Sequence, residues 1–148
     1  MIKRIFDIFF SVIVLICLIP IFLLISLLIK IDSKGPVFFA WDVIGKNGSP
    51  FRGYKFRTME EGADKKKKQL LNLNEMSGPV FKIKNDPRIT KFGKFLRKYS
   101  LDELPQFWSV VKGDMSVVGP RPAGPKEWEE YEEWQKRKLS ITPGITCL

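Results

Sequence analysis

An uncharged apolar run from Ile8 to Ile29 constrains the fold of this chain more than any other feature. Its 22 residues are enough for a helix to cross a bilayer core of roughly 30 Å. Pro20 divides the run into arms of 12 and 9 residues and removes one backbone hydrogen bond, which kinks a helix. A single-pass anchor tolerates such a proline. A helix-break-helix that enters one leaflet and returns would also have its break there, so the run leaves both forms open.

Basic residues flank the run on both sides. Lys3 and Arg4 precede it, and Lys30 and Lys34 follow it, so the positive-inside rule holds both ends in the cytoplasm. Asp7 lies at the entry side, where water or a neighbouring cation can compensate its charge. These flanks favour the returning form.

The net charge of the chain is concentrated after this run. Residues 1 to 29 carry +1, so the following 119 residues carry +8 of the total of +9. Such an excess predicts an anionic partner, for example phospholipid headgroups, nucleotide phosphates or nucleic acid, although a solvated basic surface has the same composition. At 148 residues the chain is one domain, or one domain with an anchor.

Two residue types limit the chemistry. The sequence contains no histidine, which excludes Ser-His triads and imidazole-bound metals. Acid, base and nucleophilic roles must therefore fall to carboxylates, Lys, Tyr, Ser or Cys. Only Cys17 and Cys147 are present, too few for a disulfide framework or a zinc cluster, which is typical of a reducing compartment.

The residues after the apolar run predict an α+β fold that is mainly helical. Asn47-Gly48 favours a tight hairpin turn between strands Val37–Trp41 and Phe51–Phe56. Apolar residues at helical spacing predict a basic amphipathic helix from Ile89 to Tyr99, suited to a core or to a membrane surface. The other predicted elements are a solvated helix or loop over Glu60–Lys68, a short strand over Pro79–Lys84, a turn over Asn85–Pro87, a helix from Pro105 to Lys112 that stops at Gly113, a rigid loop over Gly119–Pro125 and a helix over Glu127–Leu139.

Two adjacent carboxylates, Asp102 and Glu103, stand just before the helix that Pro105 is expected to begin. A helix N-terminus offers unpaired N–H groups and partial positive charge, which keep a carboxylate ionised and also bind phosphate. An aspartate that attacks phosphorus forms an acyl-phosphate, and Arg97 and Arg121 can hold phosphate oxygens in bidentate fashion. Mg²⁺ would help to neutralise a diphosphate. Second-rank candidates for phosphate binding are Lys55, Arg57 and Arg88.

A structural alternative exists for the acid pair. Ser100-Leu-Asp-Glu103 matches the Ser-x-x-Glu pattern of a capping box, which has no catalytic meaning. Pro105 disfavours that register, because it would remove a helical hydrogen bond just after the first turn.

The motifs of the whole chain resemble those of the bacterial sugar transferases, that is, the small monotopic polyprenyl-phosphate phosphoglycosyltransferases. Several motifs in one order are far more specific than any one of them. They are Lys3-Arg4-x-x-Asp7, Pro20, Gly35-Pro-Val-Phe38, Gly45-Lys-Asn-Gly48, Tyr54-Lys-Phe-Arg-Thr-Met59, Asn85-Asp-Pro-Arg-Ile-Thr90, Ser100-Leu-Asp-Glu-Leu-Pro-Gln106, Lys112-Gly-Asp-Met-Ser116, Val118-Gly-Pro-Arg-Pro122 and Thr142-Pro-Gly-Ile-Thr146.

The resemblance implies an architecture and a location. Residues 1–33 would form a re-entrant membrane helix broken at Pro20. Residues 34–148 would form a cytoplasmic, membrane-associated catalytic domain with a small β-hairpin and amphipathic interfacial helices. The protein would lie at the cytoplasmic face of the bacterial inner membrane, in contact with membrane lipids, and a homo-oligomer stays open.

The resemblance also implies a reaction. A sugar 1-phosphate would pass from a UDP-sugar to a polyprenyl phosphate such as undecaprenyl phosphate, the first membrane step of exopolysaccharide, capsule, O-antigen or glycoprotein assembly. Asp102 would be the nucleophile that forms a phosphosugar–enzyme intermediate, and Glu103 would assist, for instance by deprotonating the lipid phosphate. Mg²⁺ would bind at Asp102, while Arg97 and Arg121 would hold phosphates.

The sequence departs from the family pattern at three places, and the last of them favours a second hypothesis. Trp41-Asp-Val43 replaces a Gln-x-Arg pattern, Ser109 replaces an Asn, and members usually continue several tens of residues beyond Ile145-Thr146. The alternative is a truncated, inactive, membrane-anchored binding protein that presents its basic face to acidic lipid or to a glycan-assembly partner. No nucleic-acid recognition motif is present, so nucleic acid is not an expected partner.

Overall fold

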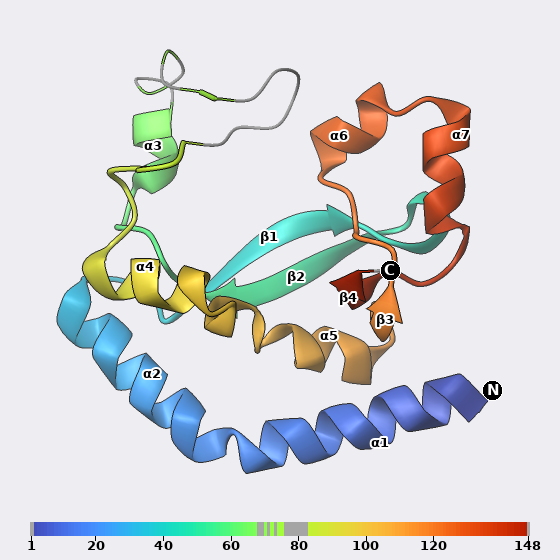
Figure 1. Ribbon diagram of the computed structural model, residues 1–148, viewed down its shortest axis with the longest axis horizontal. Helices are drawn as coiled ribbons and strands as arrows, with labels where there is room; N and C mark the ends of the chain where they lie inside the picture. The colour runs from blue at the N-terminus through green and yellow to red at the C-terminus, as the bar shows by residue number, and fades with distance from the viewer. Residues whose placement is uncertain (1, 68–69, 71, 73, 76–82, 148) are drawn as a thin grey trace.

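The computed structural model describes residues 2–67, 70, 72, 74–75 and 83–147, and it has the predicted α+β architecture (Figure 1). Two long helices form a bent band along one side, and a β-hairpin and shorter helices lie beside it. The elements are α1 (Ile2–Cys17), α2 (Ile19–Asp32), β1 (Phe38–Ile44), η1 (Lys46–Gly48), β2 (Pro50–Phe56), α3 (Ala63–Lys67), α4 (Lys91–Lys98), η3 (Leu101–Glu103), α5 (Gln106–Lys112), β3 (Ser116–Gly119), α6 (Pro125–Glu130), α7 (Glu133–Lys136), η4 (Arg137–Ser140) and β4 (Gly144–Cys147).

The predicted break at Pro20 is confirmed as a bend of 59° between α1 and α2. Pro20 lies in the first turn of α2, where its missing N–H is tolerated. Within the described residues no single helix is long and apolar enough to cross a membrane, whereas this bent pair has the required length and composition. Many large apolar side chains of both helices are exposed, from Ile2 at 85% to Ile31 at 73%.

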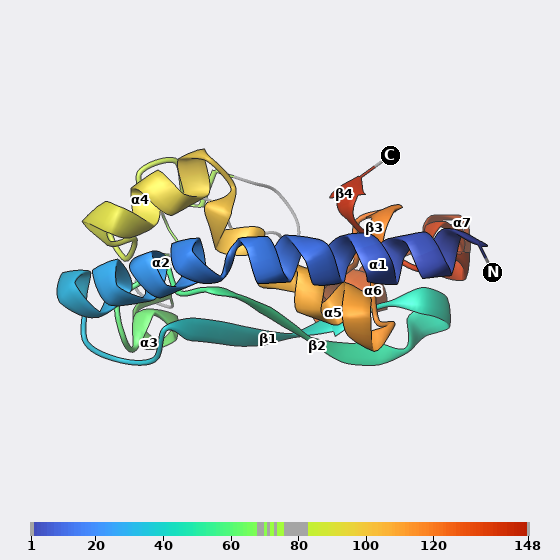
Figure 2. The ribbon, with the colours of Figure 1, turned by 90° about the horizontal axis from the view of Figure 1, so that it is seen from below.

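Two charged residues near the start of α1 fasten it to the rest of the protein. The Arg4 guanidinium donates hydrogen bonds to the carbonyl oxygens of Val110, at 2.6 Å, and Val111, at 3.0 Å. The buried Asp7 carboxylate accepts hydrogen bonds from the Ser116 hydroxyl, at 2.7 Å, and the Val117 N–H, at 3.2 Å. These bonds join α1 to the last turn of α5 and to the beginning of β3. As a result α5 lies along α1 (Figure 2).

Both predicted strands are confirmed, and each is longer than the sequence indicated. β1 and β2 pair antiparallel in a register that runs from Phe38↔Phe56 to Ile44↔Pro50. Asn47 (φ 54°) and Gly48 (φ 80°) both have positive φ, as a primed hairpin turn requires.

The first core cluster fixes α2 and α4 against the hairpin. Ile29, Phe56 and Leu96 are at most 2% exposed and pack with Ile25. The Phe22 ring meets the Phe56 ring edge-on, with centroids 5.1 Å apart. The amphipathic helix predicted over residues 89–99 therefore exists as α4 and buries Leu96, while Phe95 and Tyr99 stay half exposed.

Local signals fix the start of α4, the helix before the acid pair, and the end of α5, the helix after it. The Thr90 hydroxyl accepts a hydrogen bond from the Gly93 N–H at 3.0 Å and caps α4. Gly113, with φ 106°, ends α5 as predicted. The capping-box alternative is wrong, because Ser100 has φ 54° and its side chain makes no capping hydrogen bond. Leu101–Glu103 instead forms the short turn η3 between α4 and α5.

The single helix predicted over Glu127–Leu139 is also wrong. Tyr131 adopts an extended conformation (ψ 134°), which separates α6 from α7. Trp128, before the break, and Tyr131, at it, both pack against the second core cluster of Ile44, Ala123 and Leu139. β4 then pairs in parallel with β3, a contact that the sequence did not indicate.

Two other predicted segments are only partly covered by the described residues. The polar stretch Glu60–Lys68 contains the short helix α3. Most of the predicted strand Pro79–Lys84 lies outside the described residues. The turn at Asn85–Pro87 is confirmed, and it leads into the buried pair Asp86–Arg88.

This buried pair predicts a pH-dependent stability. The Arg88 guanidinium lies 2.6 Å from Asp86, and its hydrogen bonds hold the Asp86 pKa below its usual value of 3.8. We expect Asp86→Asn to lower the free energy of unfolding by about 3–5 kcal/mol at pH 7, because it removes the charged carboxylate that lies against the buried Arg88 guanidinium. Since the folded-state pKa is depressed, the wild-type advantage should persist down to about pH 3.8 and shrink only below it. Denaturation of both proteins between pH 2.5 and 7 measures this, and a gap that closes above pH 5 would contradict it.

The conformation of Ser100 gives a second stability prediction. A left-handed φ costs a non-glycine residue about 1 kcal/mol, so we expect Ser100→Gly to raise the free energy of unfolding by about 0.5–1 kcal/mol. A capping serine would instead lose a few tenths of a kcal/mol on replacement by glycine. The sign of the change in the free energy of unfolding of the Ser100→Gly protein, measured by equilibrium denaturation, decides between the two.

Candidate active site

Five charged side chains from separate parts of the fold share one electrostatic environment. Glu103 and Asp102 come from η3, and they are joined by Lys55 at the end of β2, Arg97 in the last turn of α4 and Arg121 in the loop after β3. Lys55 interacts with each of the other four, and Glu103 interacts with Asp102, Lys55 and Arg121. The structure thus brings together three of the predicted phosphate-binding residues with the predicted catalytic pair.

The turn η3 presents its two carboxylates differently. Asp102 is 7% exposed, whereas Glu103 is exposed and lines a cavity. The left-handed conformation of Ser100 reverses the chain after α4, and the Glu103 N–H then donates to the Ser100 carbonyl at 3.2 Å. A strained residue beside a charged cluster is often part of a functional site.

Burial and neighbouring charges shift the titration of Glu103 and Lys55. Partial desolvation by the surrounding protein raises the pKa of Glu103, and the negative charge of Asp102 raises it further. Burial lowers the pKa of Lys55, with repulsion from Arg97 acting in the same direction. A carboxyl group with a raised pKa is a better proton acceptor near neutral pH than an ordinary glutamate. The site therefore pairs a buried carboxylate, Asp102, with an exposed one, Glu103, whose pKa is raised.

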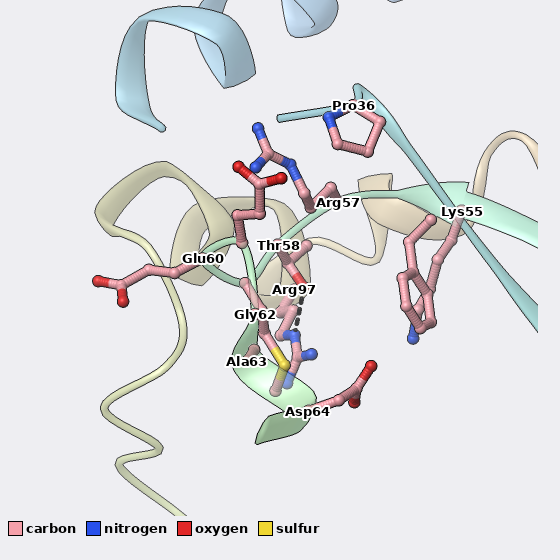
Figure 3. A pocket seen from close by; sticks show the side chains of 12 residues that line it. Pro36, Lys55, Arg57, Thr58, Glu60, Gly62, Ala63, Asp64 and Arg97 are labelled. Carbon is pink, nitrogen blue, oxygen red and sulfur yellow. Dashed lines mark hydrogen bonds between the residues drawn. The ribbon is translucent and has the colours of Figure 1, made fainter. Parts of the chain in front are cut away.

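Lys55 separates two cavities. Its ammonium lies 4.9 Å from the centroid of the Trp41 ring and 5.7 Å from that of the Phe39 ring, and the two rings are stacked. The larger cavity, of about 410 Å³, is lined by Trp41, Glu103 and Arg121 among others. The smaller cavity, of about 270 Å³, is lined on the other side of Lys55 by Arg97 and the segment 57–64 (Figure 3).

Arg57 and Arg88, the other two candidates for phosphate binding, have structural partners. Arg57 donates to the carbonyl oxygens of Ser33, at 2.9 Å, and Lys34, and so caps the end of α2. Arg88 donates to Asp86 and, at 3.3 Å, to the Ala63 carbonyl oxygen. Their guanidinium groups therefore brace the walls of the site.

The donor set suits a magnesium ion that arrives with a phosphorylated ligand. Among the described residues no group of three or more Cys, Asp or Glu side chains could hold a metal ion. Magnesium, however, is usually bound by one or two carboxylates together with substrate phosphates. Asp102, with Glu103 beside it, fits that mode.

Sequence reasoning missed several residues that shape the site. Thr58, which is 3% exposed, accepts a hydrogen bond from Arg97 Nε at 2.9 Å and orients that guanidinium. Trp41 and Gln106 line the larger cavity, and Asp64 lines the smaller one. The position of Thr58 directly after Arg57, in the run Lys55-Phe-Arg-Thr58, was the available signal, whereas the others depend on contacts distant in sequence.

Comparison with known proteins relates this site to a family. The profile described as bacterial sugar transferase matches residues 1–148. The galactosyl transferase CpsE of Streptococcus agalactiae is 51% identical over 99% of this chain and 32% of its own length. The exopolysaccharide production protein ExoY of Rhizobium meliloti is 42% identical over 100% of this chain and 67% of its own length. The undecaprenyl-phosphate galactose phosphotransferase of Salmonella typhimurium is 43% identical over 99% of this chain and 31% of its own length.

The chain therefore spans about a third of the length of the streptococcal and Salmonella relatives and about two thirds of the rhizobial one. Two of these names describe transferases, which favours the enzyme over the binding-protein alternative. With a profile that matches from the first residue to the last, this chain belongs to the bacterial sugar transferase family.

Proposed function

We propose that this chain transfers a sugar 1-phosphate from a UDP-sugar to a polyprenyl phosphate such as undecaprenyl phosphate. The observation that carries the proposal is the buried Asp102 beside Lys55, Arg97 and Glu103, at a site flanked by two cavities. The names of the relatives support a sugar, in two cases galactose, and an undecaprenyl phosphate acceptor.

The reaction has two displacements at one phosphorus atom. An Asp102 carboxylate oxygen attacks the phosphorus that carries the sugar, and the bond from this phosphorus to the bridging oxygen breaks, releasing the nucleoside monophosphate. An oxygen of the polyprenyl phosphate then attacks the phosphosugar–aspartate. That step restores the Asp102 carboxylate and leaves the sugar on a lipid-linked diphosphate.

The neighbouring groups serve both displacements. Arg97, Arg121 and Lys55 would stabilise the negative charge on the phosphate oxygens. Glu103, with its raised pKa, would take a proton from the acceptor phosphate before that phosphate attacks. Mg²⁺, when bound at Asp102 with the diphosphate, would neutralise part of its charge.

We infer that residues 1–33 enter and leave the cytoplasmic leaflet and that residues 34–148 rest on it. The bent pair of helices and their exposed apolar side chains support this arrangement. Phe95, Tyr99 and Trp108 would reach the interface from α4 and the following helices, since each is about half exposed. The acceptor phosphate would then approach the site at the depth of the lipid headgroups.

Trapping the covalent intermediate tests the reaction. Incubation with UDP-galactose labelled in the phosphate next to the sugar, with Mg²⁺ but without lipid acceptor, should place label on Asp102 and release one UMP per labelled protein. Asp102→Asn should remove both signals. Glu103→Gln should still accept label but transfer it to polyprenyl phosphate at least about 100-fold more slowly, because general acid–base catalysis contributes about that much. Full turnover by Asp102→Asn would reject the mechanism.

Topology is tested separately. In protein whose cysteines are replaced by serine, we expect new cysteines at Ile2 and Lys34 to react with an impermeant maleimide added from the cytoplasmic side of inverted vesicles. Both positions are exposed in the fold. Protection of Ile2→Cys, together with labelling of Lys34→Cys, would indicate a single-pass anchor instead.

A further inference from the structure

The smaller cavity places a carboxylate, Asp64, that the two displacement steps do not use, near two cations that they do use. Figure 3 shows the Arg97 guanidinium, the Asp64 carboxylate and the Lys55 side chain directed toward a common space, whereas Glu60 points away from it. Within the described residues none of the ion pairs joins Asp64 to Arg97 or Lys55. The cavity therefore combines two cations that suit a phosphate with a carboxylate that suits a hydroxyl donor.

Arg97 links this cavity to the reacting carboxylate. Its Nε is bound to Thr58, which directs the rest of the guanidinium into the cavity, and its charge interacts with that of Asp102. A leaving phosphate held by Arg97 would therefore carry its organic substituent into the cavity. In the reaction proposed above, the leaving phosphate belongs to the nucleoside.

The walls match a nucleoside better than a sugar phosphate. Phe39 and Pro36 supply apolar surface for a planar base, and Asp64 supplies an acceptor for vicinal hydroxyl groups, as acidic residues do for ribose in nucleotide-binding folds. The larger cavity beyond Lys55, lined by Trp41 and Glu103, is left for the sugar.

The wall that carries Asp64 is held in place without a ligand. The Ala63 carbonyl oxygen accepts a hydrogen bond from Arg88, and the Glu60 N–H donates to the Arg88 carbonyl oxygen at 2.9 Å. The buried Asp86–Arg88 pair thus fixes both sides of residues 61 and 62. A preformed wall lowers the entropy cost of binding.

We propose that this cavity binds the nucleoside half of the donor, with the Asp64 carboxylate accepting hydrogen bonds from the ribose hydroxyls and Arg97 holding the adjacent phosphate. The inference rests on the proposed function and assigns Asp64 a role in binding that donor.

The test measures the affinity of the Asp102→Asn protein, in nanodiscs with Mg²⁺, for UDP and for 2′,3′-dideoxy-UDP. UDP should bind at least about tenfold more tightly, since a hydrogen bond to a charged group is lost without the hydroxyls. Adding Asp64→Ala should weaken UDP binding by a similar factor and make the two ligands equal. Glu60→Ala is the matched control from the same wall and should leave both affinities unchanged.

The outcomes separate this inference from the reaction. Equal affinity of the Asp102→Asn protein for UDP and its dideoxy analogue overturns the inference whether or not the Asp64 variant folds. If the protein with Asp64→Ala added keeps the preference for UDP, the inference is also overturned. In either case, label trapped on Asp102 in the protein that retains this aspartate would still support the reaction. Absence of both UDP binding and trapped label rejects the proposed function, and this inference with it.

Discussion

The joint between α1 and the rest of the chain is the contact on which the site depends. Asp7 is 4% exposed and sits in an apolar helix, so its charge is tolerable only because Ser116, Val117 and Lys3 surround it with hydrogen-bond donors. Arg4 similarly donates to the carbonyl oxygens of Val110 and Val111 in the last turn of α5. A helix with so much exposed apolar surface is therefore fixed to the polar domain by a few directional bonds.

This joint has consequences at the other end of α5. The acid pair lies in the turn just before α5, and Arg121 lies in the loop just after β3. Arg4 and Asp7 therefore hold the two elements, α5 and β3, that adjoin Asp102 and Arg121. Arg57 makes the corresponding connection from β2 to the end of α2. The helices that would enter the leaflet are thereby part of the scaffold of the site, and the height of the acid pair above them is fixed.

The parts of the fold that the sequence predicts well are those with local causes. Asn47-Gly48 and Gly113 each act through the conformation or hydrogen bonds of their own turn, and both were correctly interpreted. The capping-box alternative failed on the local conformation of Ser100, whereas the other two errors involve tertiary contacts. Tyr131 leaves the helical conformation to reach Ile44 and Leu139, and β4 finds β3 across more than twenty residues. Helical spacing alone carries no information about either contact.

The same distinction holds for the site. Residue type identified the acidic pair as the catalytic candidate. It identified five cations as phosphate-binding candidates, because guanidinium and ammonium groups are generic phosphate ligands. The sequence ranked Arg97 and Arg121 first, but only the fold separates Lys55, which shares the environment of the acid pair, from Arg57 and Arg88, which satisfy carbonyl oxygens and Asp86. The latter two are more buried, at 7% and 4% exposure. A buried guanidinium needs fixed partners, and Arg57 and Arg88 have them, so Lys55, Arg97 and Arg121 are the cations whose partner can be a ligand.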